Sequence, residues 1–531
     1  MNTTTLDIVG DTRIEGPFAA DWASLKAGYR VPDWYRDAKF GLWAHWGPQC
    51  VPEAGDWYAR HMYIQGTPQY EHHVRHYGHP ADVGFIEIQR QWQAENWDPD
   101  DLLSLYKAAG ARYFVAMANH HDNFDAWDSR WHPWNSTRIG PKRDIIGTWA
   151  ERARAHGLRF GVSNHAAHAW HWFQTAYGYD PEGPRAGERY DAFRLGRKDG
   201  AGKWWDGLDP QEVYAGAVMP MPDGITDAKA AEDWHEAHDR VWEEKPPLTN
   251  PIFVRDWYRR CKDLIDSYDP DLVYFDNFDL PLGQAGLDIA AHFYNRSIAK
   301  RGGLDVVLNT KELPEHRQGA LVEDVERGFR SSIVPEVWQT DTCIGEWHYK
   351  REIFERKAYM KADAVVHRLT DVVAKNGNLL LSIPMRGDGT IDSEERAIVT
   401  AVGEWMERFG AAIHETRPWR VFGEGPTEVK SGQFGEGAAA PFTGADIRFT
   451  TRPDALFATT LGVAAPTLTI ASLRTGGQLV SGEVGRVEVV GGGEALAFRR
   501  DEKGLHVEVP EGARHGFGTA FRIMGDGLVE E

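Results

Sequence analysis

The chain has 531 residues, of which 42% are hydrophobic, so it is long enough for two or three domains with sizeable cores. Its formal net charge of −20 disfavours nucleic acid and anionic membranes as partners, because both require a surplus of Lys and Arg. The three cysteines lie far apart and form no CxxC pair, which argues against a disulfide framework or a structural zinc site.

The sequence also bears on location. It contains no apolar run of about 18 residues, so no membrane-spanning helix is expected. Residues 1–16 show neither the basic nor the apolar region of a signal peptide. We therefore expect a cytoplasmic protein, or a periplasmic or secreted one if a leader was removed before numbering. The sequence leaves open whether the chain forms a homo-oligomer.

Apolar runs alternate with helical patterns through about the first 380 residues, which is typical of β/α units and a parallel sheet. Strands are predicted at 38–47, 112–121, 159–165, 271–277, 304–310, 320–326 and 378–384. Helices are predicted at 98–111, 147–158, 250–270, 287–303, 349–374 and 393–410. About eight strand candidates favour a (β/α)8-like barrel. The alternative, an open doubly wound sheet, lacks a GxGxxG or Walker motif.

Two further regions depart from this alternation. Residues 166–250 form a long insertion rich in Gly, Pro, Trp and charge, and an insertion after a barrel strand lies on the active face. From about residue 425 onward, short β-rich runs alternate with glycine turns. We therefore predict a catalytic barrel over residues 1–420 and a C-terminal antiparallel β-sandwich domain over residues 421–531.

Polar side chains gather where the predicted strands end, and in a barrel these ends meet at one face. They are His45, Trp46, His120, His121, Asp122, Asn164, His165, Asp276, Asn309, Lys311, Glu323, Asp324 and Glu326. Two carboxylates on different strand ends, among His and Trp, are what glycoside hydrolysis needs: one attacks the anomeric carbon and the other exchanges a proton. Considered singly, Asp276 also fits a turn or helix cap, and Glu326 a surface ion pair with Arg327.

The histidines raise a metal site as the rival interpretation. The runs EHHVRH (71–76) and HAAHAWH (165–171) offer ligands at helical spacing. No HExxH motif and no further ligand spacing accompany them, so we predict no metal. A serine nucleophile is not supported either, because GxSxG is absent.

Four segments, in order along the chain, resemble signatures of the α-L-fucosidases of glycoside hydrolase family 29. They are WYRDAKFGLWAHWGPQCVPEAGDWYARHMY (34–63), YFVAMANHHDNFDAWDS (113–129), LVYFDN (272–277), and NGNLLLSIPMRGDGTI followed by GEWMERFGAAIHETRPW (376–391 and 403–419). Each segment alone is a weak signal. Their shared order makes the resemblance specific.

The resemblance implies a retaining exo-hydrolase that releases terminal α-L-fucose from fucosylated oligosaccharides or glycoconjugates without a metal or other cofactor. By this likeness Asp276 is the nucleophile, and Glu326 the acid/base, with Glu323 as a weaker rival. Substrate binding falls to His45, Trp46, Asp56, His120, His121, His165 and Lys311. The family often has Trp-Glu where this chain has Trp338-Gln339, so that position cannot supply an acid.

The chain departs from the family pattern at several positions. Asp56, Asn123, Tyr274 and Asn277 stand where Glu, Gly, Trp and Gly are usual, and Lys311 about where Arg often occurs. These departures leave two alternatives to a fucosidase: hydrolysis of a related sugar such as an α-L-galactoside, or a barrel that binds fucose without turnover.

Overall fold

A computed structural model describes residues 14–240, 251–438 and 440–529. Eight parallel strands close into a barrel, in which β1 pairs with both β2 and β8. The strands are β1 (Phe40–Ala44), β2 (Tyr113–Asn119), β3 (Arg159–Asn164), β4 (Leu272–Phe278), β5 (Val307–Lys311), β6 (Val322–Asp324), β7 (Trp338–Cys343) and β8 (Gly377–Ser382). The predicted barrel is confirmed.

Helices follow most strands and pack around the barrel. The longer ones are α6 (Pro99–Ala108), α7 (Ile145–Ala155), α12 (Pro251–Tyr268), α13 (Gln284–Arg301), α15 (Ala362–Ala374) and α16 (Ser393–Phe409). Others are α1 (Trp22–Gly28), α2 (Asp33–Ala38), α3 (Tyr58–His61), α4 (Pro68–His76), α5 (Phe85–Gln91) and α14 (Arg351–Arg356). The N-cap of α6 is Asp98, whose carboxylate accepts from the backbone N–H groups of Asp100 and Asp101.

Two predictions for the barrel were wrong in detail. β7 was not among the predicted strands, because its residues WQTDTC are mostly polar although all are buried. The single helix predicted over 349–374 is two helices, α14 and α15. α14 ends at Lys357, whose φ of +52° is left-handed and stops the helix without a glycine.

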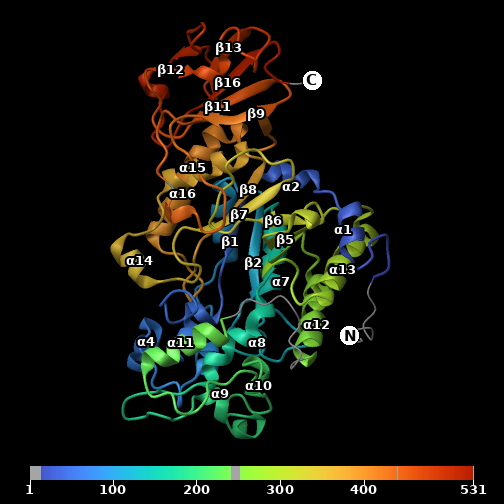
Figure 1. Ribbon diagram of the computed structural model, residues 1–531, viewed down its shortest axis with the longest axis vertical. Helices are drawn as coiled ribbons and strands as arrows, with labels where there is room; N and C mark the ends of the chain where they lie inside the picture. The colour runs from blue at the N-terminus through green and yellow to red at the C-terminus, as the bar shows by residue number, and fades with distance from the viewer. Residues whose placement is uncertain (1–13, 241–250, 439, 530–531) are drawn as a thin grey trace.

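In the connection between β3 and β4, the described residues before α12 include the helices α8 (Ala169–Trp172), α9 (Asp191–Arg194), α10 (Pro210–Val213) and α11 (Ala228–His238). Figure 1 shows them grouped at the end of the molecule far from the C-terminal strands. The last part of the predicted insertion, residues 241–250, lies outside the described residues.

The C-terminal region contains two antiparallel sheets, as predicted. One has the strand order β13-β16-β11-β10-β9 and the other β12-β15-β14. Their strands are β9 (Arg417–Glu424), β10 (Ile447–Arg452), β11 (Ala455–Thr460), β12 (Thr467–Ile470), β13 (Val484–Val489), β14 (Phe498–Arg500), β15 (Leu505–Glu508) and β16 (Ala520–Gly525). The larger sheet packs on α15 (Figure 1). Because β9 begins at Arg417, we propose that the domain boundary lies before this residue rather than at 420.

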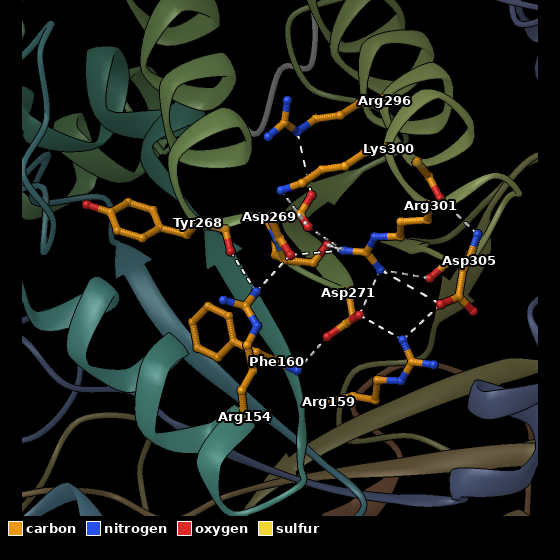
Figure 2. A network of polar contacts seen from close by, with 12 residues as sticks. Arg154, Arg159, Phe160, Tyr268, Asp269, Asp271, Arg296, Lys300, Arg301 and Asp305 are labelled. Atoms are coloured by element: carbon orange, nitrogen blue, oxygen red, sulfur yellow. Dashed lines mark hydrogen bonds and ion pairs between the residues drawn. The ribbon is translucent and has the colours of Figure 1, made fainter.

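A network of ion pairs connects the N-terminal ends of β3 and β4 (Figure 2). Asp271, just before β4, accepts hydrogen bonds from Arg159 (2.9 Å), Arg301 (2.8 Å) and the backbone N–H of Phe160 (2.9 Å). These N-terminal strand ends lie on the barrel face opposite the carboxyl ends, where the polar side chains gather. Residues on this face serve stability rather than chemistry in barrel enzymes.

Among residues 14–240, 251–438 and 440–529, no helix is both long and apolar enough to cross a membrane.

Candidate active site

The carboxyl ends of the barrel strands surround a cavity of about 520 Å³, a volume suited to a small ligand. Its lining includes six histidines: His45, His61, His120, His121, His165 and His168. The charged lining residues are Asp56, Arg240, Asp276, Lys311, Glu326 and Asp341. The aromatic ones are Trp43, Trp57, Phe278, Trp347 and Phe434. Eight of the nine residues predicted for the site therefore meet in one place.

Asp276 and Glu326 reach this cavity from different parts of the chain. Asp276 is on β4, and Glu326 follows β6 by two residues. The Lys311 ammonium, at the end of β5, forms an ion pair with Oδ1 of Asp276 and another with Oε2 of Glu326. The other oxygen of Asp276, Oδ2, lies 3.3 Å from Nε2 of His121 and 3.2 Å from Nδ1 of His165. Asp276 thus contacts three nitrogen atoms, and it shares one of them, Nζ of Lys311, with Glu326.

This arrangement lowers the pKa of Asp276 and raises the pKa of Glu326. Burial opposes ionisation of Asp276, but the charge of Lys311 and the contacts with His165 and His121 outweigh it and hold its pKa well below the usual value. For Glu326, burial dominates over the opposing charge of Lys311, and Asp276 adds to it, so its pKa is raised. Between the two pKa values Asp276 is a carboxylate and Glu326 a carboxylic acid. Such a split is how two carboxyl groups take different roles in one site.

Three of the histidines in the cavity, His45, His120 and His165, are buried in a way that disfavours their charged form. Burial lowers the pKa of His45 and of His120 well below the usual range, and neighbouring imidazoles add to the effect. Burial lowers the pKa of His165 to about 4, although Asp276 opposes this. The Gln49 amide donates to Nδ1 of His120 over 3.0 Å, so the proton of that ring is on Nε2. Neutral rings offer one donor and one acceptor, which suits hydroxyl groups.

The same rings bear on metal binding. Among the described residues, His120, His121 and His165 form a group whose nitrogens lie within 4.8 Å of one another, close enough for a shared ion. These nitrogens also face Asp276 and the cavity, where they equally suit the hydroxyls of a bound ligand. The run EHHVRH, which the sequence offered as a rival metal site, lies on α4, where His73 forms hydrogen bonds with the Tyr58 hydroxyl (2.7 Å) and the Val83 carbonyl (2.7 Å).

Comparison with known proteins identifies the family. The sequence profile described as "Alpha-L-fucosidase" matches residues 8–411. The chain belongs to the alpha-L-fucosidase family. It is accordingly a glycoside hydrolase, a fucose-releasing glycosidase by family and fold.

Several known alpha-L-fucosidases align with this chain over most of its length. Tissue alpha-L-fucosidase of Homo sapiens is 26% identical over 415 residues, covering 76% of this chain and 73% of its own. The Rattus norvegicus counterpart is 25% identical over 416 residues, covering 77% and 74%. Among solved structures, Thermotoga maritima alpha-fucosidase in complex with a mechanism-based inhibitor has a TM-score of 0.68, with 24% identity, covering 96% of this chain and 100% of that one. The structural likeness concerns the fold.

Two departures from the alpha-L-fucosidase pattern have a structural explanation. Asn123 stands where the family has Gly and has a left-handed φ of +60°, which Asn tolerates better than most residues. Its amide donates to the carbonyls of Glu212 (3.0 Å) and Val213 (3.2 Å), in the connection between β3 and β4. Its oxygen accepts from Arg260 on α12 (2.6 Å). Asn123 therefore fastens that connection to the end of β2.

Asn277, which replaces another family Gly, ends a chain of hydrogen bonds behind β4. His171 Nδ1 donates to the Asp239 carbonyl (2.9 Å), which leaves its Nε2 to accept from Nδ1 of His168 (3.1 Å). His168 Nε2 then accepts from the Asn277 amide (2.9 Å). His168 Nε2 also lies 3.1 Å from the backbone carbonyl oxygen of Asp276. A glycine at 277 could not make this link between the insertion and the residue beside Asp276.

Asp56 and Tyr274 also have defined partners. The Asp56 carboxylate accepts from the backbone N–H groups of Trp347 (3.1 Å) and His348 (2.7 Å), so it orients the loop that places Trp347 in the cavity. The Tyr274 hydroxyl donates to Asp341 on β7 (3.0 Å). Burial, with Glu326 next in effect, raises the pKa of Asp341 to about 7.

Two predicted residues are not in the cavity. Trp46 packs against Trp92 and Trp97 and donates to the Arg386 carbonyl (2.8 Å), outside the barrel mouth. Neighbouring residues of a strand point to opposite faces, so His45 faces the cavity and Trp46 the surrounding helices. Glu323, the rival acid/base, pairs with Arg330 (2.6 Å) and accepts from the backbone of Leu313 (3.2 Å), away from Asp276.

The sequence reasoning missed other lining residues. Asp341 lies on the unpredicted strand β7, and Trp347 follows that strand. His168 was considered only as a metal candidate. Phe434 comes from the connection between β9 and β10, far along the chain from the barrel strands. In the sequence, only Asp341 had a recognisable feature: it is a carboxylate that lies shortly before a tryptophan, Trp347.

Proposed function

We propose that the chain releases terminal α-L-fucose from fucosylated oligosaccharides or glycoconjugates by double displacement, with Asp276 as nucleophile and Glu326 as acid/base. The observation that carries the proposal is the contact of one Lys311 ammonium with both carboxylates. It supports two carboxyl groups acting on one bond. The family of the chain supports the sugar.

The same contact favours retention of configuration. Two carboxylate oxygens that each make a charge-assisted contact of about 2.8 Å with one nitrogen lie at most about 5.6 Å from each other. Retaining glycosidases need their carboxyl groups about 5–5.5 Å apart, whereas inverting enzymes need about 6.5–9.5 Å to admit a water molecule. The separation therefore suits direct attack by Asp276 and a covalent fucosyl-enzyme.

The roles follow from the charges. Ionised Asp276 attacks the anomeric carbon while protonated Glu326 gives its proton to the leaving oxygen. Glu326, then a carboxylate, takes a proton from the water that releases fucose from Asp276. Lys311 keeps Asp276 ionised, and His45, His120, His121 and His165 bind the sugar hydroxyls. Asp56 acts by orienting the loop that bears Trp347.

The test is hydrolysis of matched aryl glycosides followed by trapping. We expect a higher kcat/KM for an aryl α-L-fucoside than for the α-L-galactoside, which adds a hydroxyl at C6. We further expect a 2-fluoro-α-L-fucosyl fluoride to add one fluorofucosyl mass to the protein, on the peptide that contains Asp276. Faster turnover of the galactoside would reassign the sugar, and label on another carboxylate would reassign the nucleophile.

A further inference from the structure

Phe434 is the one cavity-lining residue supplied by the C-terminal region among the described residues. It belongs to residues 431–436, called here the crossing segment, in the connection between β9 and β10. Its side chain is one of the few large hydrophobic groups on the described surface, with 59% of the residue exposed. Burial therefore does not account for a phenylalanine at this position.

Backbone hydrogen bonds fix the crossing segment against the residues that carry the acid/base. The N–H of Phe434 donates to the carbonyl of Glu326 (2.8 Å), and that of Glu436 to the carbonyl of Arg327 (2.9 Å). Gly432 and Phe329 exchange a pair of bonds of 3.0 and 3.3 Å. Phe434 is thus tied directly to Glu326, and its position relative to the acid/base is set by the backbone.

A glycine makes this contact possible. A Cβ atom added at Gly328 would lie 2.1 Å from the carbonyl oxygen of Gly432, too close for any side chain. The carboxylate of Glu436 fastens the end of the segment by accepting from the Thr342 hydroxyl (2.6 Å) and pairing with Arg368 (3.2 Å). The glycine after Glu326 and Arg327 is therefore explained by the approach of the C-terminal region.

The backbone of Phe434 is strained, with a left-handed φ of +54°. A bulky residue rarely adopts this conformation, and such strain persists where the surroundings impose it, often at functional sites. Here the bond to Glu326 imposes it. The strained backbone holds an exposed ring at the rim of the cavity.

We propose that Phe434 is the platform on which the leaving sugar of a fucosylated glycan stacks. The inference rests on the proposed function, because Glu326 protonates the leaving oxygen and so marks the side on which the departing sugar lies. A pyranose ring has an apolar face that packs against an aromatic ring. The C-terminal region thereby contributes to selection of the leaving group.

The experiment compares two substrates with the same fucosyl group. α-L-Fucosyl fluoride has no leaving sugar, whereas a fucosylated disaccharide, chosen from a panel of linkage isomers as the one cleaved fastest by the unmodified enzyme, has one. Phe434→Asn removes the ring with a residue that tolerates the left-handed backbone. Phe434→Trp keeps an aromatic face. Phe193→Asn is the matched control, because Phe193 is also an exposed phenylalanine (48%) but lies outside the cavity.

We expect Phe434→Asn to lower the ratio of kcat/KM for the disaccharide to that for the fluoride by about three- to ten-fold. Phe434→Trp should restore the ratio to within about two-fold, and Phe193→Asn should leave it unchanged. Equal losses on the two substrates, or an unchanged ratio in Phe434→Asn, would overturn the inference. An unmodified enzyme that hydrolyses neither substrate contradicts the proposed function itself, and the inference falls with it.

Discussion

Asp276 and Glu326 are 50 positions apart in the sequence, yet their carboxylates contact the same nitrogen, Nζ of Lys311. The lysine stands between them at the end of β5, the strand that pairs with both β4 and β6. Because β4, β5 and β6 are neighbours in the barrel, the side chains at their carboxyl ends lie together. The consequences of this shared contact can be measured.

Replacement of Asp276 by Gly removes the proposed nucleophile and leaves space where its carboxylate lay. We expect kcat on an aryl α-L-fucoside to fall by on the order of a thousandfold or more, and added azide to restore part of the turnover by forming fucosyl azide. Asp341→Asn is the matched control, since Asp341 is a second cavity carboxyl group and its loss should not be rescued. Near-normal turnover of Asp276→Gly contradicts the assignment.

Replacement of Glu326 by Ala removes the proposed proton donor. The loss should be about 10²- to 10⁴-fold for a disaccharide, whose leaving group needs a proton, and much smaller for an activated aryl fucoside. The measurement is kcat/KM across aryl fucosides of increasing leaving-group pKa, with Glu323→Ala as control. A uniform loss along the series, or the steeper dependence in Glu323→Ala, would point to another acid.

Removal of the Lys311 charge should move the whole pH profile. The lysine lowers the pKa of both Asp276 and Glu326, so Lys311→Met raises both values. The acid limb of kcat/KM, where Asp276 becomes protonated, and the alkaline limb, where Glu326 loses its proton, should both shift to higher pH. Lys311→Arg retains the charge and should shift the limbs less. Limbs that stay in place or move to lower pH are incompatible with the arrangement.

Asp271 should matter for stability and not for chemistry. Asp271→Ala deletes three hydrogen bonds and leaves Arg301 without one of its carboxylate partners (Figure 2). Because Arg159 is partly exposed, we expect a modest loss of about 1–3 kcal/mol in the free energy of unfolding. Denaturant unfolding gives this value, and kcat/KM at low temperature should remain within two-fold, since the network lies at the far barrel face. A large drop in kcat/KM with unchanged stability would contradict this separation.

The sequence predicted most of the barrel because its strands are apolar runs between amphipathic helices. β7 was not predicted, because four of its residues are polar and show no apolar periodicity. They are Gln339, Thr340, Asp341 and Thr342, and all four are buried. The strand ends located Asp276, Glu326, Lys311 and the histidines. Trp46 was misplaced because a strand end presents alternate residues to opposite faces.

Phe434 could not be foreseen for a different reason. It enters the cavity only because a segment after β9 pairs with the residues around Glu326, a contact between regions about 100 positions apart. No local pattern in the sequence encodes such a contact. The glycine at 328 has the same origin, since a side chain there would meet the carbonyl oxygen of Gly432.

The stereochemistry of the first product tests the central claim most directly. Proton NMR of an aryl α-L-fucoside, recorded at high enzyme concentration before mutarotation, distinguishes the two anomers of released fucose. Double displacement through Asp276 predicts that α-L-fucose forms first and the β anomer grows in later. Initial formation of β-L-fucose would mean single displacement by water, and would contradict a covalent fucosyl-enzyme on Asp276.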